Sequence, residues 1–404
     1  MPDLVPDPGH FSASEDELTV DVSPIAGVPN NGLRLPRLRP RLKTRPRLAV
    51  GLFIATCIST TWAGAALAEI DPEMNRSEFL RACLASGLEF TAAVMGILIA
   101  HEMGHFLQAK RYEVPATLPF FIPMPISPFG TMGAVIVQAS GYANRRAMFD
   151  IAISGPLAGL LVTIPVTLWG LQSSTVVTLP KNPDMPILVY GDPLLLQWMI
   201  EWVHGPLADG QTVLLNPLVF AGWVGIFITA LNLLPIGQLD GGHILYTLIG
   251  KRAHVVALSL MAAAAVYMVL ARDPSFSVLL VLLLLMGPKH PPTTDDTVPL
   301  GTGRHLAGWI TLGFLAIGLT PAPIDVIEPQ PPAQPSAPTA PTTHRPRPSG
   351  TQLTRRYPSQ RLFMNDRASV ASCSSDSYIR RQIFVAAARS GNERPKASTT
   401  IQPS

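Results

Sequence analysis

The residues of this 404-residue sequence best suited to chemistry are His101-Glu102-Met103-Gly104-His105, an HExxH pattern that follows an apolar stretch. On an α-helix, residues four apart project from one face, so both imidazoles can bind one zinc ion. Glu102 lies beside them and can act as general base toward water that the metal activates. The pattern predicts a hydrolytic zinc site with His101 and His105 as ligands and Glu102 as the catalytic base.

A third protein ligand must come from farther along the chain. Residues 114–149 contain no His, Asp or Glu, and position 111 is Arg, so ligand sets that continue directly after the motif are excluded. Asp240 follows a later apolar stretch, and the glycines beside it allow the backbone to turn tightly. We expect Asp240 to be the ligand, with Asp150 as the weaker competitor. The other candidates are Glu201 and His204, which fall on the opposite side of the membrane, and His243, which we interpret as an interfacial histidine.

The composition indicates a membrane protein. Hydrophobic residues make up 48% of the chain and charged residues only 14%, against about 25% charged in soluble domains. We expect an all-α polytopic membrane protein with about six transmembrane helices, and a short apolar arm at 275–287 after the fifth. The expected spans are 48–69, 83–109, 147–171, 213–235, 253–271 and 305–320.

One stretch between the second and third spans does not fit a helix. Five prolines lie between Pro115 and Pro128, and the run from Met132 to Gln138 is rich in β-branched residues. We expect a small membrane-associated β-hairpin or re-entrant loop over 117–139. Such backbone is tolerated at membrane depth where protein or a water-filled cavity surrounds it.

The two ends of the chain differ in composition from the middle. Residues 1–47 are predicted to be a disordered cytoplasmic leader whose acidic residues argue against a secretion signal and an organelle transit peptide. Residues 321–404 are predicted to be a disordered Pro/Ser/Arg-rich tail. The domain between them is 48–320. The three cysteines of the chain, Cys57, Cys83 and Cys373, are too dispersed for a disulfide framework or a thiolate zinc site.

The distribution of basic residues predicts the orientation of the chain in the membrane. The basic run at 34–47 reads as a topology signal rather than a nucleic-acid-binding arm, because no aromatic residue interrupts it. With that run inside, Lys110, Arg111, Arg145, Arg146, Lys251 and Arg252 also fall inside. The histidines and Asp240 then share one membrane depth. We expect a bacterial plasma membrane protein with a cytoplasmic N-terminus and active-site opening, bilayer lipid as its surroundings and no nucleic-acid partner.

Three motifs in order resemble the site-2 protease family, peptidase family M50, over about residues 85–250. They are the HExxH residues, Ser154-Gly155-Pro156-Leu157-Ala158-Gly159, and the run from Asn232 to Gly241, which fits NxxPxxxxDG. The resemblance implies a three-helix catalytic core, a buried Zn²⁺ and peptide-bond hydrolysis within or near transmembrane segments, as in regulated intramembrane proteolysis. It also implies that Asn232 contacts substrate or the oxyanion, although a helix-ending role is equally consistent with the sequence. Gly130, Thr131 and Gly133 resemble a hairpin on the substrate side.

The predicted protein is compact, with a transmembrane protein as substrate. We expect a mixed loop over 172–211, and no PDZ-type adaptor domain, because neither 106–146 nor this loop is long enough for one. Two rivals stay open. A catalytically inactive scaffold of the same family would be expected to lack Glu102 or a ligand, and all four residues are present. A metal transporter would be expected to spread ionisable residues over several spans near the midplane.

Overall fold

The structure is a computed structural model, and it describes the chain between residues 45 and 387 with several gaps. The described residues are 45–71, 73–139, 141–179, 187–208, 210–271, 280–281, 283–284, 287, 290, 292–320, 323–327 and the strand at 385–387. The predicted leader before residue 45 and most of the predicted tail lie outside them, as does most of the predicted arm at 275–287. Residues 324–327, within the stretch predicted as tail, form a strand.

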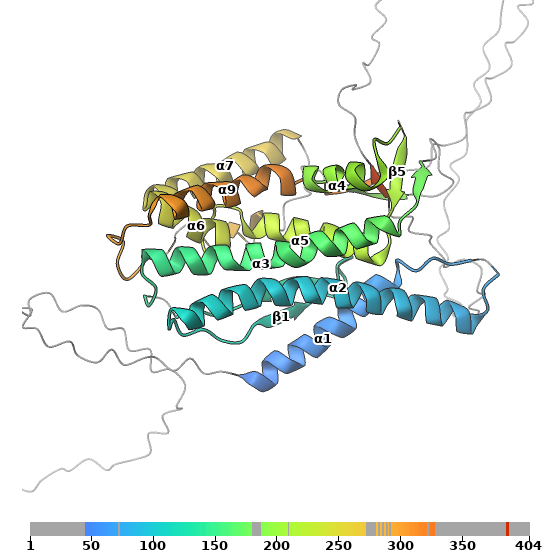
Figure 1. The fold of residues 1–404 in the computed structure, drawn as a ribbon, viewed down its shortest axis with the longest axis horizontal. Coiled ribbons are helices and arrows are strands. Elements are labelled where there is room, and N and C mark those ends of the chain that lie inside the picture. Colours follow the sequence, from blue (N-terminus) through green and yellow to red (C-terminus); the bar gives the residue numbers. More distant parts are fainter. Residues whose placement is uncertain are drawn as a thin grey trace, which may run out of the picture. The chain divides into compact units, whose positions relative to one another are not determined.

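The described part of the chain is mostly helical, as the sequence predicts (Figure 1). The helices are α1 (Pro46–Ala65), α2 (Arg76–Arg111), α3 (Arg145–Gln172), α4 (Leu194–His204), α5 (Pro217–Asn232), α6 (Asp240–Ile249), α7 (Arg252–Ala271) and α9 (Thr302–Gly318). Asn side chains cap the first turns of α2, α3 and α5, where backbone N–H groups would otherwise lack partners. These caps fix where the three central helices begin.

Helices α2, α3 and α5 run alongside one another and form the core of the protein (Figure 1). Small residues bring α3 and α5 together. A Cβ added to Gly222 would lie 2.0 Å from Thr167 Oγ1, and one added to Gly225 would lie 2.7 Å from Thr163 Oγ1. Such close approach of backbones is how helices associate in lipid, where burial of apolar surface gives little driving force.

Polar contacts join α1 to α2. Thr91 lies 3.0 Å from the hydroxyl of Thr60 and 2.9 Å from that of Thr61, and Ser86 donates to the carbonyl of Gly64. Hydroxyl hydrogen bonds of this kind link helices in an apolar environment. They place α1 against the N-terminal half of α2, away from the histidines.

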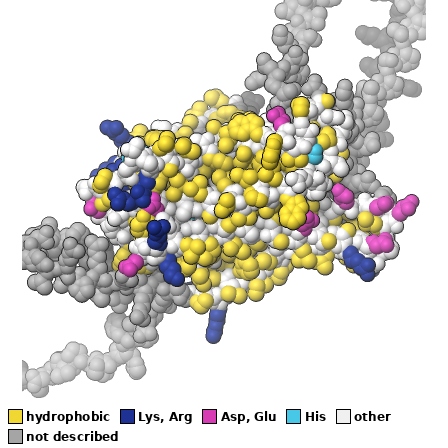
Figure 2. Space-filling view, viewed as in Figure 1, with side chains coloured by type: hydrophobic (Ala, Val, Ile, Leu, Met, Phe, Trp, Pro, Cys, Tyr) yellow, Lys and Arg dark blue, Asp and Glu magenta, His cyan; other side chains and the backbone are white. Residues whose placement is uncertain are grey.

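Within the described residues, four helices are long and apolar enough to cross a membrane: α1, α2, α3 and α7. The shorter α5 has 16 residues and α9 has 17. Figure 2 shows a broad hydrophobic surface on this face, with Lys and Arg gathered mainly at one end and most Asp and Glu at the other. We call the first the basic end, formed by Lys110, Arg111, Arg145, Arg146, Lys251 and Arg252.

Strands occur in two places. β1 (Phe120–Pro123) and β2 (Thr131–Val135) pair antiparallel within the region predicted as a hairpin, and its membrane association stays a prediction. A second sheet has the order β3-β5-β7-β4-β6. Its strands are β3 (Val176–Thr178), β4 (Ile187–Gly191), β5 (Gln211–Leu214), β6 (Ile324–Ile327) and β7 (Val385–Ala387). The expectation of a mixed loop over 172–211 is therefore wrong, because α4 and strands of this sheet occupy it.

Candidate metal centre

The proposed ligands come from two elements that are far apart in the sequence. His101 and His105 lie one turn apart near the end of α2, and Asp240 is the first residue of α6. The turn between α5 and α6 is tight, since Gly237 has φ +55° and a Cβ on Gly241 would lie 1.9 Å from the Leu233 carbonyl oxygen. The glycines noted in the sequence thus allow Asp240 to face α2.

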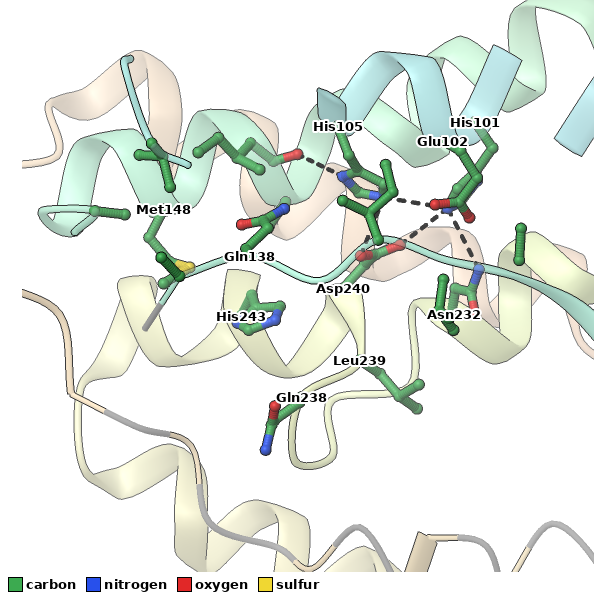
Figure 3. Close-up of a pocket in the computed structure, with 18 of the residues that line it drawn as sticks. His101, Glu102, His105, Gln138, Met148, Asn232, Gln238, Leu239, Asp240 and His243 are labelled. Carbon is green, nitrogen blue, oxygen red and sulfur yellow. Dashed lines mark hydrogen bonds and ion pairs between the residues drawn. The ribbon is translucent and has the colours of Figure 1, made fainter. Parts of the chain in front are cut away.

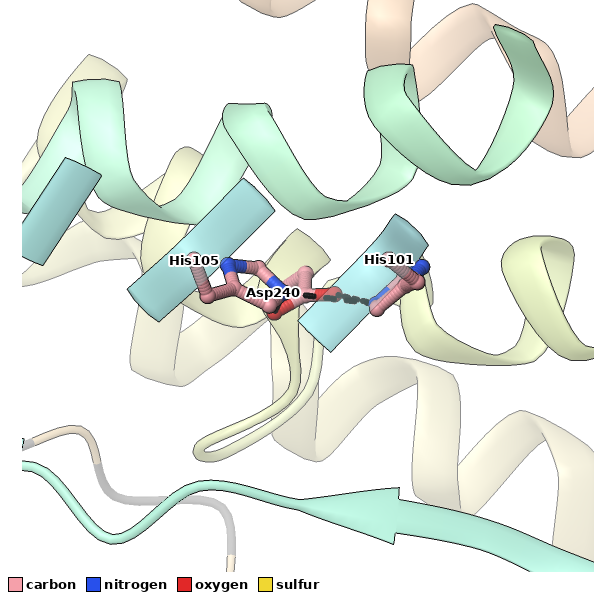
Figure 4. A group of neighbouring side chains, drawn as sticks. All are labelled: His101, His105 and Asp240. Carbon is pink, nitrogen blue, oxygen red and sulfur yellow. Dashed lines mark hydrogen bonds and ion pairs between the residues drawn. The ribbon is translucent and has the colours of Figure 1, made fainter. Parts of the chain in front are cut away.

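The side chains of His101, His105 and Asp240 converge (Figure 4). Asp240 Oδ2 lies 3.2 Å from His101 Nε2, Asp240 Oδ1 lies 3.2 Å from His105 Nε2, and the two Nε2 atoms are 3.3 Å apart. A tetrahedral zinc ion with bonds of about 2.0–2.1 Å holds its ligand atoms about 3.3 Å apart. The donor set and its spacing therefore fit zinc.

Surrounding groups fix the imidazoles in this arrangement. His105 Nδ1 donates to the carbonyl of Ile151 at 2.8 Å, which leaves Nε2 unprotonated and available to a metal. Two glycines of α3 make room for the rings. A Cβ on Gly155 would lie 2.0 Å from His105 Nε2, and one on Gly159 would lie 3.2 Å from His101 Nδ1. The glycines of the third-helix motif thus abut the predicted ligands.

A cavity of about 280 Å³ opens onto the three side chains (Figure 3). Glu102 lines it and is 5% exposed, comparable to His101 at 4% and His105 at 7%. Asn232, the last residue of α5, directs Nδ2 to within 3.3 Å of His101 Nε2. A general base and an amide donor therefore border the space where a substrate carbonyl would approach the metal.

One wall of the cavity is extended backbone that continues β2. Ala134, Val135, Ile136 and Gln138 line it. Gly130, which precedes β2, and Thr131 and Gly133, which lie in β2, are outside the lining. Val137 pairs with Thr117, and Ala139 N donates to the Pro115 carbonyl. Because backbone groups alternate in direction along a strand, those of Ile136 and Gln138 face the opposite edge. The wall therefore offers an edge for an added strand.

The other predicted ligand candidates lie outside the converging set. Asp150 accepts hydrogen bonds from Arg304 Nε (2.7 Å) and Nη2 (2.8 Å) and from the Tyr112 hydroxyl. Glu201 is exposed on α4, and His204 on the same helix lies 2.9 Å from the carbonyl of Leu171. The structure thus gives Asp150 and His204 other partners.

His243 lines the cavity but does not join the three converging side chains. Its Nδ1 lies 2.5 Å from His290 Nε2, and burial lowers the pKa of His243 to about 4, so the ring is neutral. His290 comes from the segment before α9 and stacks on Tyr246. Nothing in the sequence marks His290, because it lies 47 residues from His243.

Two further contributors to the site also escape sequence reasoning. Gln138 lines the cavity, and its side chain points toward it (Figure 3). The Ile151 carbonyl orients His105 through a backbone atom, which no residue type reveals. The alternation of the predicted strand was the available signal for Gln138, since it places every second residue on one face.

Fold and site define a mostly helical protein with four candidate membrane spans and a buried cluster of two histidines and one aspartate whose spacing fits a metal ion. Residues 89–271 match the sequence profile of peptidase family M50, as the motifs predict. Relatives include the probable zinc metalloproteases EGY1, chloroplastic, of Oryza sativa subsp. japonica, 33% identical over 58% of this chain and 41% of the relative, and of Arabidopsis thaliana, 32% identical over 60% and 44%. EGY2 of Arabidopsis thaliana is 28% identical over 58% of this chain and 40% of the relative.

These comparisons support the predicted zinc cofactor, since the relatives are named zinc metalloproteases. The chain spans less than half the length of the three relatives it is compared with. The prediction of a bacterial plasma membrane is wrong, because these relatives are chloroplastic proteins of plants. Positive-inside charge orients a protein in a membrane but carries no information on which membrane that is.

Proposed function

We propose that this chain is an intramembrane zinc metalloendopeptidase that cleaves membrane proteins within or near their transmembrane segments. The observation that carries the proposal is the meeting of His101, His105 and Asp240 at zinc spacing beside Glu102. The Asp240 carboxylate lies 139 residues from the His101 imidazole in sequence. A scaffold or a transporter has no need of a general base at this position.

The residues around the cavity can divide the work of hydrolysis. Bound between the three side chains, zinc supplies a Lewis acid that activates water and polarises a peptide carbonyl. Glu102 accepts a proton from the attacking water and delivers it to the leaving amine. The Asn232 amide donates to the carbonyl oxygen as that atom gains negative charge.

The substrate is best explained as an extended segment. A helical peptide hides its carbonyls in its own hydrogen bonds, so a transmembrane substrate has to unwind before attack. The edge at Ile136 and Gln138, whose backbone has no hydrogen-bond partner among the described residues, supports binding by strand addition, with main-chain hydrogen bonds that hold the peptide along the cavity. A membrane-anchored protein cleaved in regulated intramembrane proteolysis suits this site. Glycine or proline near the scissile bond should then speed cleavage of a model transmembrane substrate several-fold.

We also propose six membrane crossings, adding α5 and α9 to the four long helices. At 1.5 Å per residue, each spans about 25 Å, slightly less than a 30 Å hydrocarbon layer. Local thinning of the bilayer can cover this difference at modest cost. For the membrane itself, the relatives' names support a chloroplast membrane. Immunodetection of the chain in membranes of isolated chloroplasts would test this location.

The decisive experiment uses Glu102→Gln in the full-length chain reconstituted with zinc and a model transmembrane substrate. The variant should retain zinc and lose at least about a hundredfold in cleavage rate, since general-base catalysis contributes about 10²–10⁴-fold. Glu89→Gln is the matched control, because it makes the same change at an exposed position of the same helix. Normal cleavage by Glu102→Gln would contradict the proposal.

A further inference from the structure

A second cavity, of about 520 Å³, lies at the basic end between α3, α6 and α7. Arg145 enters it from the start of α3, and Lys251 and Arg252 enter from the junction of α6 and α7. Gly250, with φ +64°, makes the sharp turn that brings these two residues to its rim. The metal centre's cavity shares none of these residues.

The charge of this cavity is unbalanced. Asp296 is its single acidic lining residue, and its two oxygens already accept hydrogen bonds from Tyr246 (3.0 Å) and Thr293 (2.7 Å). Lys251 and Arg252 are exposed and form no ion pair within the described part of the chain. The cavity therefore holds two cations that an anionic ligand could neutralise.

Arg145 is held differently from the two exposed cations. Its Nε donates to the Thr247 carbonyl at 2.7 Å, and its Nη2 donates to the Leu248 carbonyl at 3.3 Å. A guanidinium at the C-terminal end of α6 is favourable, because the unpaired carbonyls there carry partial negative charge. Arg145 thus adds a positive charge at a fixed position to the lining that contains Lys251 and Arg252.

The surface beside the cavity is apolar and exposed. Val255 and Leu258, in the first two turns of α7 after Arg252, are 67% and 59% exposed. Since α7 is a candidate membrane span that begins at Arg252, its first turns lie where headgroups give way to acyl chains. A ligand with an anionic head and an apolar tail matches both features.

We propose that this cavity binds the phosphate headgroup of an anionic phospholipid, whose acyl chain lies along Val255 and Leu258. Basic pockets between transmembrane helices are known to bind such headgroups. The bound headgroup bridges α3, α6 and α7, and α6 begins at Asp240, so lipid binding stabilises the element that carries the third metal ligand. The proposal requires a membrane protein but does not depend on peptidase activity.

Thermal unfolding of the full chain in neutral detergent tests the site. The probes are dioctanoyl phosphatidylglycerol, dioctanoyl phosphatidylcholine and inorganic phosphate, each titrated separately. Phosphatidylglycerol should raise the Tm at concentrations where phosphatidylcholine and inorganic phosphate do not. An equal rise with inorganic phosphate would overturn the lipid assignment, and an equal rise with phosphatidylcholine would overturn the role of the anionic head.

A double variant, Lys251→Gln with Arg252→Gln, locates the effect. It should weaken the phosphatidylglycerol response about thirtyfold in concentration, since each basic residue near anionic lipid contributes about 1 kcal/mol. The control, Arg76→Gln with Arg81→Gln, removes the same charge from exposed positions in the first turns of α2, at the opposite end of that helix from Lys110 and Arg111. Its Tm should respond to phosphatidylglycerol like that of the unmodified chain. An unchanged response in the first double variant, or an equal loss in the control, would overturn the proposal.

Discussion

Gly155 of α3 lies so close to His105 of α2 that a Cβ at this position would fall 2.0 Å from the Nε2 atom. The His105 ring cannot easily move aside, because its Nδ1 atom donates a hydrogen bond to the Ile151 carbonyl. The glycine is thus required by the metal centre itself, in addition to the packing of α2 against α3. This contact makes a metal ligand depend on a residue from a different helix.

Gly155→Ala should therefore impair zinc binding. The added methyl group displaces the His105 ring, and overpacking of this kind costs about 1–3 kcal/mol, so zinc affinity should fall about tenfold or more. Metal analysis of the purified chain against a graded zinc chelator measures this. Gly96→Ala is the control, since a Cβ there meets nothing within 4 Å. Equal zinc affinity in the two variants would show that the contact between Gly155 and His105 does not constrain zinc binding.

Asp240→Asn and Asp150→Asn should separate the two predicted candidates for the third ligand. Asp240→Asn should lower zinc content sharply, because a neutral amide is a poor zinc ligand. Asp150→Asn should keep its zinc and lose about 1–3 kcal/mol of stability, because it weakens the charged hydrogen bonds from Arg304. Metal analysis and denaturant unfolding distinguish these outcomes. Zinc loss in Asp150→Asn together with retained zinc in Asp240→Asn would assign the ligand role to Asp150.

Asn232→Ala tests whether this residue acts in catalysis or only ends α5. As a donor to the developing oxyanion, it should reduce kcat by about 10²-fold or more while zinc content and KM change little. A helix-ending role instead predicts lower stability with kcat per folded molecule unchanged. Single-turnover cleavage, corrected for the folded fraction, decides between these roles.

Asp192 should make stability depend on pH. It follows β4 outside the candidate spans, is 8% exposed, and both its carboxylate oxygens lack a hydrogen-bond partner among the residues that the structure describes. Burial raises its pKa to about 7 in the folded chain, whereas an unfolded aspartate titrates near 3.9. Between these values the folded state binds more protons, so this group lowers stability as pH rises from about 4 to 7.

The Asp192→Asn variant measures that effect. It should be more stable than the unmodified chain at pH 8, by on the order of 2–4 kcal/mol, with a smaller difference at pH 5. Unfolding at the two pH values provides the comparison. Asp71→Asn, at an exposed position, should leave the pH dependence unchanged. A constant difference between Asp192→Asn and the unmodified chain at both pH values would exclude ionisation as the cause.

The sequence predicted the convergence at the metal centre because its signals are local. The i, i+4 spacing places two imidazoles on one helix face, and glycines next to Asp240 permit the turn that α6 requires. Contacts made through space gave no such signal. The approach of Gly155 to His105, the Ile151 carbonyl and the pairing of His243 with His290 all depend on how separate elements pack.

The prediction of the fold from the sequence was wrong mainly in the region between α3 and α5. Acidic residues over 172–211 favoured a loop, yet β3, β4 and α4 form there and β5 begins at its end. The strands β3 and β5 are three and four residues long, too short for a clear alternation of apolar and polar positions. The strands β7, which pairs with β5 and β4, and β6, which pairs with β4, come from after residue 320, and such distant pairing has no local signature.

Zinc-edge X-ray absorption on the purified full chain tests the central claim most directly, because it counts the ligands of the bound ion. Two imidazole nitrogens at about 2.0–2.1 Å should accompany oxygen donors, with no sulfur at about 2.3 Å. His105→Ala should reduce the imidazole count to one in whatever zinc is retained. A sulfur contribution, or two imidazoles persisting in His105→Ala, would contradict a site built by His101, His105 and Asp240.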